Sequence, residues 1–179
     1  RGIKWSDGKP VTSDDIMFWY EDVLLNADLL PVIPAWLRPG GEVVKVTKVD
    51  ERTVRFDFAV PNGLFLKRLA AGDPAFSEIS NGNMILPAHY LKKFHIKYNK
   101  DWVESETKRR GMQSWTELWK WAVTCWLNPE LPTLNPWIVK VPLGEGTEVV
   151  FERNPFYWKI DPEGNQLPYL DRVVFEVHN

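Results

Sequence analysis

The first residues of the chain, GIKWSDGKPVTSDDI, already combine the end of a strand, a tight turn and the start of a capped helix. Asp7-Gly8 followed by Pro10 is turn chemistry, because these residue types favour the backbone angles of a chain reversal. Thr12 precedes Asp15 by three residues, the spacing of a helix capping box. We therefore expect a chain that starts in the middle of a folding unit.

The composition is typical of a folded chain, and neither positive nor negative charge is in large excess. The 179 residues are 44% apolar and 13% aromatic, which is enough for a sizeable core. The net charge is −2 and the sequence pI is about 6.0, so we expect no nucleic-acid partner. No apolar run reaches the roughly 20 residues of a membrane span, and no targeting segment is recognisable.

The numbers of cysteines and tryptophans limit the kinds of site that the chain can form. The single cysteine, Cys125, excludes an internal disulfide and a cysteine-built metal site, and it is predicted to be a small buried hydrophobic residue rather than a reactive thiol. The chain has ten tryptophans, an unusually large number. Their flat apolar faces suit a core and also suit sugar or aromatic ligands, and we expect most of them in the core.

Periodicity in the first half predicts a mixture of helices and a hairpin. Apolar residues at helical spacing predict a helix over 13–26. The alternation in EVVKVTKVDERTVRFDFAV predicts an antiparallel hairpin that turns at 50–52, with Val49 on its apolar arm. The loop between them is rich in proline and glycine and holds Trp36, which is either a plug over the core or a contact for another molecule.

Further along the chain, the pattern predicts a short helix ended by Gly72, then a short strand in NMIL, and then a helix with Pro87 in its first turn. Two more helices are expected over 100–110 and from Ser114 onward. The second of these has a capping box and an apolar face formed by Trp115, Leu118, Trp119, Ala122 and Val123.

After Cys125 the helical periodicity stops, and three strands are expected at 137–141, 148–154 and 172–179. We therefore predict two parts, 1–125 and 126–179. The fold class is α+β, with mixed or antiparallel sheets and flanking helices. The last strand runs to the final residue, so both ends are expected to be cut.

The residue pattern supports neither catalysis nor a metal site. His89, His95 and His178 are dispersed and share no metal-ligand spacing, and nucleotide and hydrolase motifs are missing from the sequence. The stretch DPEGNQLPYLD fails the ligand spacing of a calcium loop, so it is predicted to be a turn. Asp14-Asp15 complements a helix N-terminus rather than forming an acid–base pair. No cofactor is expected.

Several motifs, in a fixed order, resemble one family. GIKWSDGKPVTSDDIMFWYE at 2–21, ILPAHYL at 85–91, EVVFERNPFYW at 148–158 and DPEGNQLPYLDRVVFEV at 161–177 are similar to stretches of the extracellular solute-binding proteins of the oligopeptide-binding type (family five), which are receptors of ABC importers. The resemblance covers nearly the whole chain.

The resemblance implies an internal fragment of a periplasmic-binding-protein-like fold of class II with three lobes. Residues 1–125 would form most of the small middle lobe, and residues 126–179 would form a linker and the start of the return into the first lobe. The signal peptide and the lipid-attachment cysteine would lie outside this chain. The full-length protein is expected to be periplasmic or extracellular, tethered as a lipoprotein and monomeric.

One step departs from the family pattern. NPWIV at 135–139 stands where the family usually has G-P-Y, so Asn135 replaces Gly at a hinge-like position and Trp137 replaces Tyr. Together with Trp36 and Trp126, these are the candidate ligand-binding or hinge residues.

The sequence leaves three functions open. The resemblance favours a subunit that captures oligopeptides or oligosaccharides by lobe closure and passes them to a membrane permease, without catalysis. The alternatives are a sugar-binding module of a carbohydrate-active enzyme and a tryptophan-rich interaction scaffold. The tryptophan excess favours a sugar over a peptide.

Overall fold

The chain divides into two compact units. The computed structural model of the protein describes residues 2–71, 77–80 and 83–177. Unit 1 consists of Arg1–Val11 and Trp121–Asn179, and unit 2 of Thr12–Lys120. The opening segment belongs to unit 1 because hydrogen bonds join it to later residues, such as the bond from the Ser6 N–H to the Thr133 carbonyl oxygen. Such a long-range pairing leaves no local signal in the sequence.

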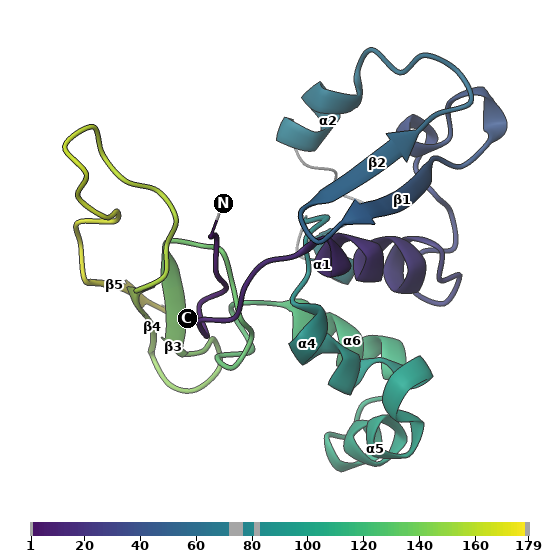
Figure 1. Cartoon of the computed structure of the whole chain (residues 1–179). Coiled ribbons are helices and arrows are strands. Elements are labelled where there is room, and N and C mark those ends of the chain that lie inside the picture. The colour runs from purple at the N-terminus through teal and green to yellow at the C-terminus, as the bar shows by residue number, and fades with distance from the viewer. Residues whose placement is uncertain (1, 72–76, 81–82, 178–179) are drawn as a thin grey trace. The chain divides into compact units, whose positions relative to one another are not determined.

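Unit 2 holds most of the helices and one hairpin (Figure 1). Its elements, in chain order, are α1 (Ser13–Phe18), the π-helix η1 (Trp19–Leu24), the 3₁₀ turns η2 (Ala35–Leu37) and η3 (Pro39–Gly41), β1 (Lys45–Asp50), β2 (Thr53–Asp57), α2 (Phe65–Ala71), α3 (Ser77–Ser80), α4 (Ala88–Leu91), the 3₁₀ turn η5 (Lys92–Phe94) and α5 (Ile96–Arg109). Helix α6 (Trp115–Val123) begins in unit 2 and ends in unit 1.

The first helix starts as the capping box predicts. Thr12 is its N-cap and accepts a hydrogen bond from the Asp14 N–H, while the Asp15 carboxylate accepts one from the Thr12 N–H. The prediction of one helix over 13–26 was wrong in its second half, because from Trp19 onward the turns widen into η1, which ends at Leu24.

The hairpin turns where predicted, between Asp50 and Thr53. Strands β1 and β2 are antiparallel, and Val46 pairs with Phe56. Between Lys48 and Asp50 the register shifts, and Val49 is exposed rather than on the buried face. A bulge of this kind adds one residue to one strand and breaks the alternation of its faces.

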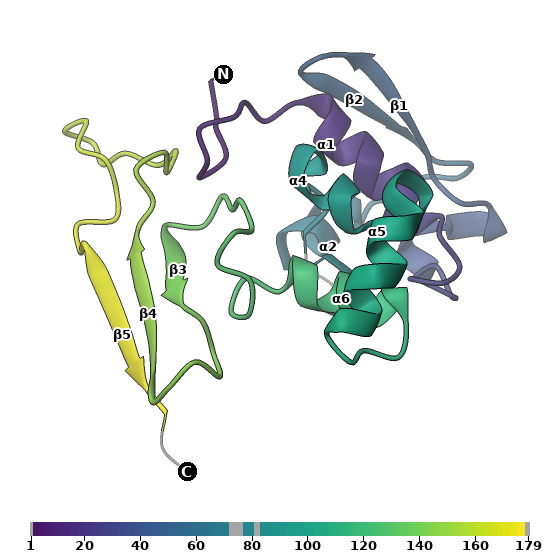
Figure 2. The ribbon, with the colours of Figure 1, turned by 90° about the horizontal axis from the view of Figure 1, so that it is seen from below.

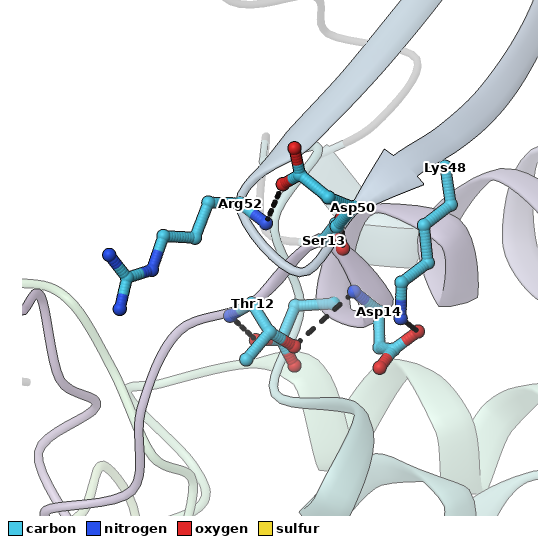
Figure 3. A network of polar contacts seen from close by, with 7 residues as sticks. Thr12, Ser13, Asp14, Lys48, Asp50 and Arg52 are labelled. Atoms are coloured by element: carbon cyan, nitrogen blue, oxygen red, sulfur yellow. Dashed lines mark hydrogen bonds and ion pairs between the residues drawn. The ribbon is translucent and has the colours of Figure 1, made fainter. Parts of the chain in front are cut away.

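The network at the start of α1 ties this helix to the hairpin (Figure 3). Ser13 Oγ donates to the Asp50 carbonyl oxygen at 2.6 Å, and Lys48 Nζ lies 2.7 Å from an Asp14 carboxylate oxygen. The Asp50 carboxylate accepts from the Arg52 N–H at 2.7 Å, and this bond is the main reason that the Asp50 pKa is lowered. The Asp14 carboxylate therefore lies in the first turn of the helix, as predicted, and also pairs with the hairpin, which was not predicted.

Later helices of unit 2 partly match the predictions. The strand expected in NMIL is not formed over its described residues 83–86, and Pro87 is the N-cap of the short α4. Helix α5 is longer than predicted and ends before Gly111, as expected. On its surface Glu106 pairs with Arg110, and Glu104 lies 3.9 Å from Lys100. Gly72 lies outside the described residues.

The apolar face predicted for α6 is confirmed. Leu118, Trp119, Ala122 and Val123 are buried, and Trp115 is half-buried. The Trp119 Nε1–H donates to the Ile79 carbonyl oxygen at 2.7 Å, which satisfies the one polar atom of a fully buried indole. Of the ten tryptophans, three are buried, five half-buried and two exposed, so fewer lie fully in the core than expected.

Unit 1 contains one three-stranded antiparallel sheet, seen in Figure 2. Its order is β3 (Trp137–Val141), β4 (Glu148–Arg153) and β5 (Arg172–Glu176). The strands fall where the alternation predicts them, although β5 ends before the last residues, and 178–179 lie outside the described part. Both sheets are antiparallel, so the α+β class is confirmed.

Candidate functional site

Parts of two family motifs meet in unit 1 at the segment where the sequence departs from the family pattern. We call this the motif junction: the opening loop 2–11, the segment 131–137 and the segment 154–158. Ser6 and Thr133 join the first two of these, because the Ser6 N–H donates to the Thr133 carbonyl oxygen and the Thr133 N–H donates to Ser6 Oγ, both at 3.0 Å. Trp5 beside them is 2% exposed.

Asn154 joins the third segment of the junction to the second. Its Nδ2–H donates to the Asn135 carbonyl oxygen at 2.9 Å, and its own N–H donates to the Pro136 carbonyl oxygen at 2.8 Å. Its Oδ1 accepts from the Phe156 N–H at 2.9 Å. Asn154 is fully buried. A buried amide with both ends bonded fixes the backbone around it, since each broken bond would leave an unsatisfied polar group.

Gly8 closes the junction against Phe156. Its φ is +85°, and a Cβ placed there would lie 3.2 Å from the Phe156 ring. Lys4 Nζ also lies over this ring, 5.5 Å from its centroid. A turn with positive φ and no room for a side chain requires glycine, which explains the Asp-Gly step of the opening motif.

Two of the predicted residues, Asn135 and Trp137, belong to the motif junction. The Asn135 side chain is exposed, and its backbone makes the contact with Asn154. Trp137 starts β3, is half-buried and donates through Nε1 to the Leu170 carbonyl oxygen at 3.2 Å. Both residues lie within unit 1, so the hinge-like step is not one of the places where the chain passes between the two units.

Trp126 lies elsewhere in unit 1, on the sheet. Its ring packs edge-on against Phe151 at 4.8 Å and contacts Phe175 at 5.5 Å, measured between centroids. Phe151 and Phe175 come from the neighbouring strands β4 and β5. The indole remains 40% exposed. Trp126 therefore covers an aromatic pair of the sheet and keeps one part of its surface open.

Trp36 is the one predicted residue in unit 2. Its ring lies 6.1 Å from that of Phe65, which also contacts Phe56 and Phe58. The Trp36 carbonyl oxygen accepts from Asn62 Nδ2 at 2.7 Å. These contacts agree with a plug over a local aromatic core, although the indole is only half-buried.

A second polar network, in unit 2, escaped the sequence analysis. The buried carboxylate of Asp22, on η1, lies 2.6 Å from Lys97 Nζ and accepts from Tyr98 Oη at 2.6 Å. The bond to Asp22 raises the pKa of Lys97, and burial is the main reason that the Tyr98 pKa is raised. The sequence does contain a signal of this network, because Asp22 follows Phe18 and Trp19 at helical spacing and so lies on their apolar face.

The loop between β4 and β5 turns at 162–163, as predicted. The Asp161 carboxylate accepts from Tyr169 Oη at 2.6 Å and from the Asn165 side chain at 2.9 Å. These bonds, with that from Tyr169 the largest, lower the Asp161 pKa to about 2. Within the described residues, no group of three His, Cys, Asp or Glu side chains could hold a metal ion.

Two further sequence expectations concern the cysteine and membrane-spanning segments. Cys125 is half-buried rather than fully buried. In the part of the chain that the structure describes, no helix is long and apolar enough to cross a membrane.

Comparison with known proteins identifies the family. Residues 1–179 match the family of bacterial extracellular solute-binding proteins, family 5 Middle. A periplasmic alpha-galactoside-binding protein of Rhizobium meliloti is 33% identical over 99% of this chain, which covers 22% of that protein.

Two solved structures are similar to the whole fold. An oligopeptide-binding protein, OppA, is 40% identical with a TM-score of 0.86, and this chain covers 26% of it. The periplasmic binding protein MelB of Agrobacterium fabrum C58, in complex with stachyose, is 28% identical with a TM-score of 0.68 over 99% of this chain and 23% of its own. The chain thus spans about a quarter of the length of these relatives. It belongs to the family 5 bacterial extracellular solute-binding proteins.

Proposed function

We propose that the intact protein is the substrate-binding component of an ABC importer, which captures an oligosaccharide or an oligopeptide and does not transform it. The observation that carries this proposal is the family match over residues 1–179. The motif junction supports it, because parts of two family-like stretches, at Ser6 and at Asn154, are bonded to the same segment 131–137. Since ligand binding favours the closed form of such a receptor, closure would report the bound solute to the permease.

The relatives divide between two ligand classes. The alpha-galactoside-binding protein and the stachyose complex favour an oligosaccharide, and OppA favours an oligopeptide. An oligosaccharide would stack on aromatic faces, whereas a peptide would need backbone hydrogen bonds and charged ends. Trp126 and Trp36 offer partly open indole faces. We propose these two as ligand contacts in the intact protein, and Asn135 and Trp137 as residues that position the chain near a hinge.

The remaining parts of the proposal follow from the family. We propose that residues 1–125 supply most of a middle lobe and that residues 126–179 lead back into a first lobe. The intact protein would act as a monomer in the periplasm or outside the cell, held to the membrane by a lipid anchor, and would need no cofactor.

Thermal unfolding of the intact protein tests this function. The melting temperature would be followed against a panel of α- and β-linked oligosaccharides and oligopeptides, because a ligand that binds only the folded state raises it. Trp126→Ala should weaken the shift more than Trp158→Ala, since Trp158 is similarly exposed but is not a proposed contact. Turnover of an oligosaccharide by the intact protein would contradict a pure receptor.

A further inference from the structure

His95 occupies a closed position between four helical elements of unit 2. It is 1% exposed and follows η5 directly as the N-cap of α5. Aromatic rings surround the imidazole on several sides, with centroids at 5.1 to 6.2 Å from its own. They belong to Phe18 on α1, Tyr98 on α5, and Trp115 and Trp119 on α6. An imidazole in such a position has little water to stabilise a charge.

Both nitrogens of the His95 ring are engaged in ways that fix its tautomer. Nδ1 accepts from the Lys97 backbone N–H at 3.2 Å, since an amide can only donate. Nε2 lies 2.9 Å from the Asp22 carbonyl oxygen, so it must carry the proton. The Asn26 amide nitrogen, 3.3 Å from Nε2, is a longer and competing contact. The two shorter bonds together require the neutral, Nε2-protonated ring.

A second proton would therefore break a structural bond. It could bind only at Nδ1, where it would meet the Lys97 N–H, and the N-cap of α5 would be lost. The ring also bonds to a carbonyl of η1, so one side chain connects the start of α5 to η1.

The charged groups around His95 do not offset the cost of protonating its ring. The charged or titratable groups near it are Asp22 on η1, Lys97 and Tyr98 on α5, Lys92 on η5, and Asp28 beyond Trp115. Asp22 favours protonation, but its carboxylate is already bonded to Lys97 and Tyr98. Burial dominates and lowers the pKa of His95 below 6.5.

We propose that His95 is an acid-sensitive latch that holds the first turn of α5 when neutral and releases the Lys97 N–H when protonated, while Nε2 keeps its bond to the Asp22 carbonyl oxygen of η1. The release is local, since the one bond that breaks belongs to the first turn of α5. It would make this part of unit 2 respond to acidification of the surroundings. The proposal does not depend on the ligand or on transport.

Hydrogen exchange of the intact protein, read by mass spectrometry on peptides that contain Lys97, tests the latch. After correction for intrinsic exchange, we expect the protection factor of the Lys97 amide to fall roughly tenfold between pH 7 and pH 5, the size of a lost helix cap. His95→Asn keeps a capping oxygen without a titratable ring and should remove this dependence on pH. His89→Asn, at an exposed histidine, should retain it.

Two results would overturn the proposal. One is an unchanged protection of Lys97 in the unmodified protein down to pH 5, which needs no variant and stands even if His95→Asn does not fold. The other is the same pH profile in His95→Asn as in the unmodified protein, because the titrating group would then be another one.

Discussion

The buried side chain of Asn154 donates a hydrogen bond of 2.9 Å to the backbone carbonyl oxygen of Asn135. Asn135 lies eighteen residues before Arg153, the last residue of β4, but it is adjacent to Asn154 in space. The bond links the R-N-P motif to the step where the sequence departs from the family pattern. It makes the backbone of Asn135, and not its exposed side chain, the structural element of that step.

Asn154→Ala should destabilise unit 1 by about 2 kcal/mol, because it removes a fully buried amide and leaves the Asn135 carbonyl and the Phe156 N–H without their partner. Asn135→Ala should change the free energy of unfolding by less than about 0.5 kcal/mol, since its side chain is exposed. Urea denaturation of both variants checks this. Equal losses would show that the Asn135 side chain carries the contact.

Gly8→Ala should cost about 1–2 kcal/mol, because it combines a positive φ with a Cβ 3.2 Å from Phe156. Gly144→Ala is the matched control, since Gly144 has φ +98° but nothing within 4 Å of its Cβ position. The difference between the two variants measures the contact alone. If both lose the same stability in thermal denaturation, Phe156 does not close the turn.

Local patterns predicted much of this fold, and long-range contacts account for the rest. The capping box at Thr12, the hairpin turn and the face of α6 depend on neighbours within a few residues, so the sequence contains the whole signal. The π-helical half of the first helix and the bulge at Val49 depend on packing against other segments. Periodicity cannot detect such an irregularity, because it assumes a constant number of residues per turn or per strand step.

The residues of the motif junction were predictable only in part, because long-range contacts hold them together. Asn135 and Trp137 were found because the family pattern changes at that step. Asn154 and Ser6 were not singled out, since each acts through one partner distant in the sequence. The apolar face marks Asp22 as unusual, but it cannot identify its partners, because Lys97 and Tyr98 lie 75 and 76 residues further along the chain.

Glu106 should make stability depend on pH in the acid range. Its bonds to Arg109 and Arg110, with Arg109 the larger cause, lower its pKa from 4.5 to about 2. The unfolded chain therefore binds this proton at a higher pH, so the stabilisation is complete above about 4.5 and is lost as the pH falls towards 2. Glu106→Gln should flatten the dependence of the unfolding midpoint over this range. Glu104→Gln, at an exposed carboxylate 3.9 Å from Lys100, should leave it unchanged.

Trp126→Ala should destabilise unit 1 by about 1–2 kcal/mol, because it removes the ring that covers Phe151 and Phe175. Trp126→Phe should recover part of this loss by keeping an edge-on ring. Urea midpoints and near-ultraviolet circular dichroism check both variants. A loss below about 0.5 kcal/mol for Trp126→Ala would show that the ring contributes little to the sheet.

The central claim is that this chain is part of a receptor for a small oligomeric solute. The most direct test is a titration of the intact protein with oligosaccharides and oligopeptides, followed by melting temperature and tryptophan fluorescence. The account predicts that one of these classes raises the melting temperature in proportion to the logarithm of its concentration above Kd, and changes the fluorescence over the same range. An unchanged melting temperature and fluorescence with both classes would contradict it.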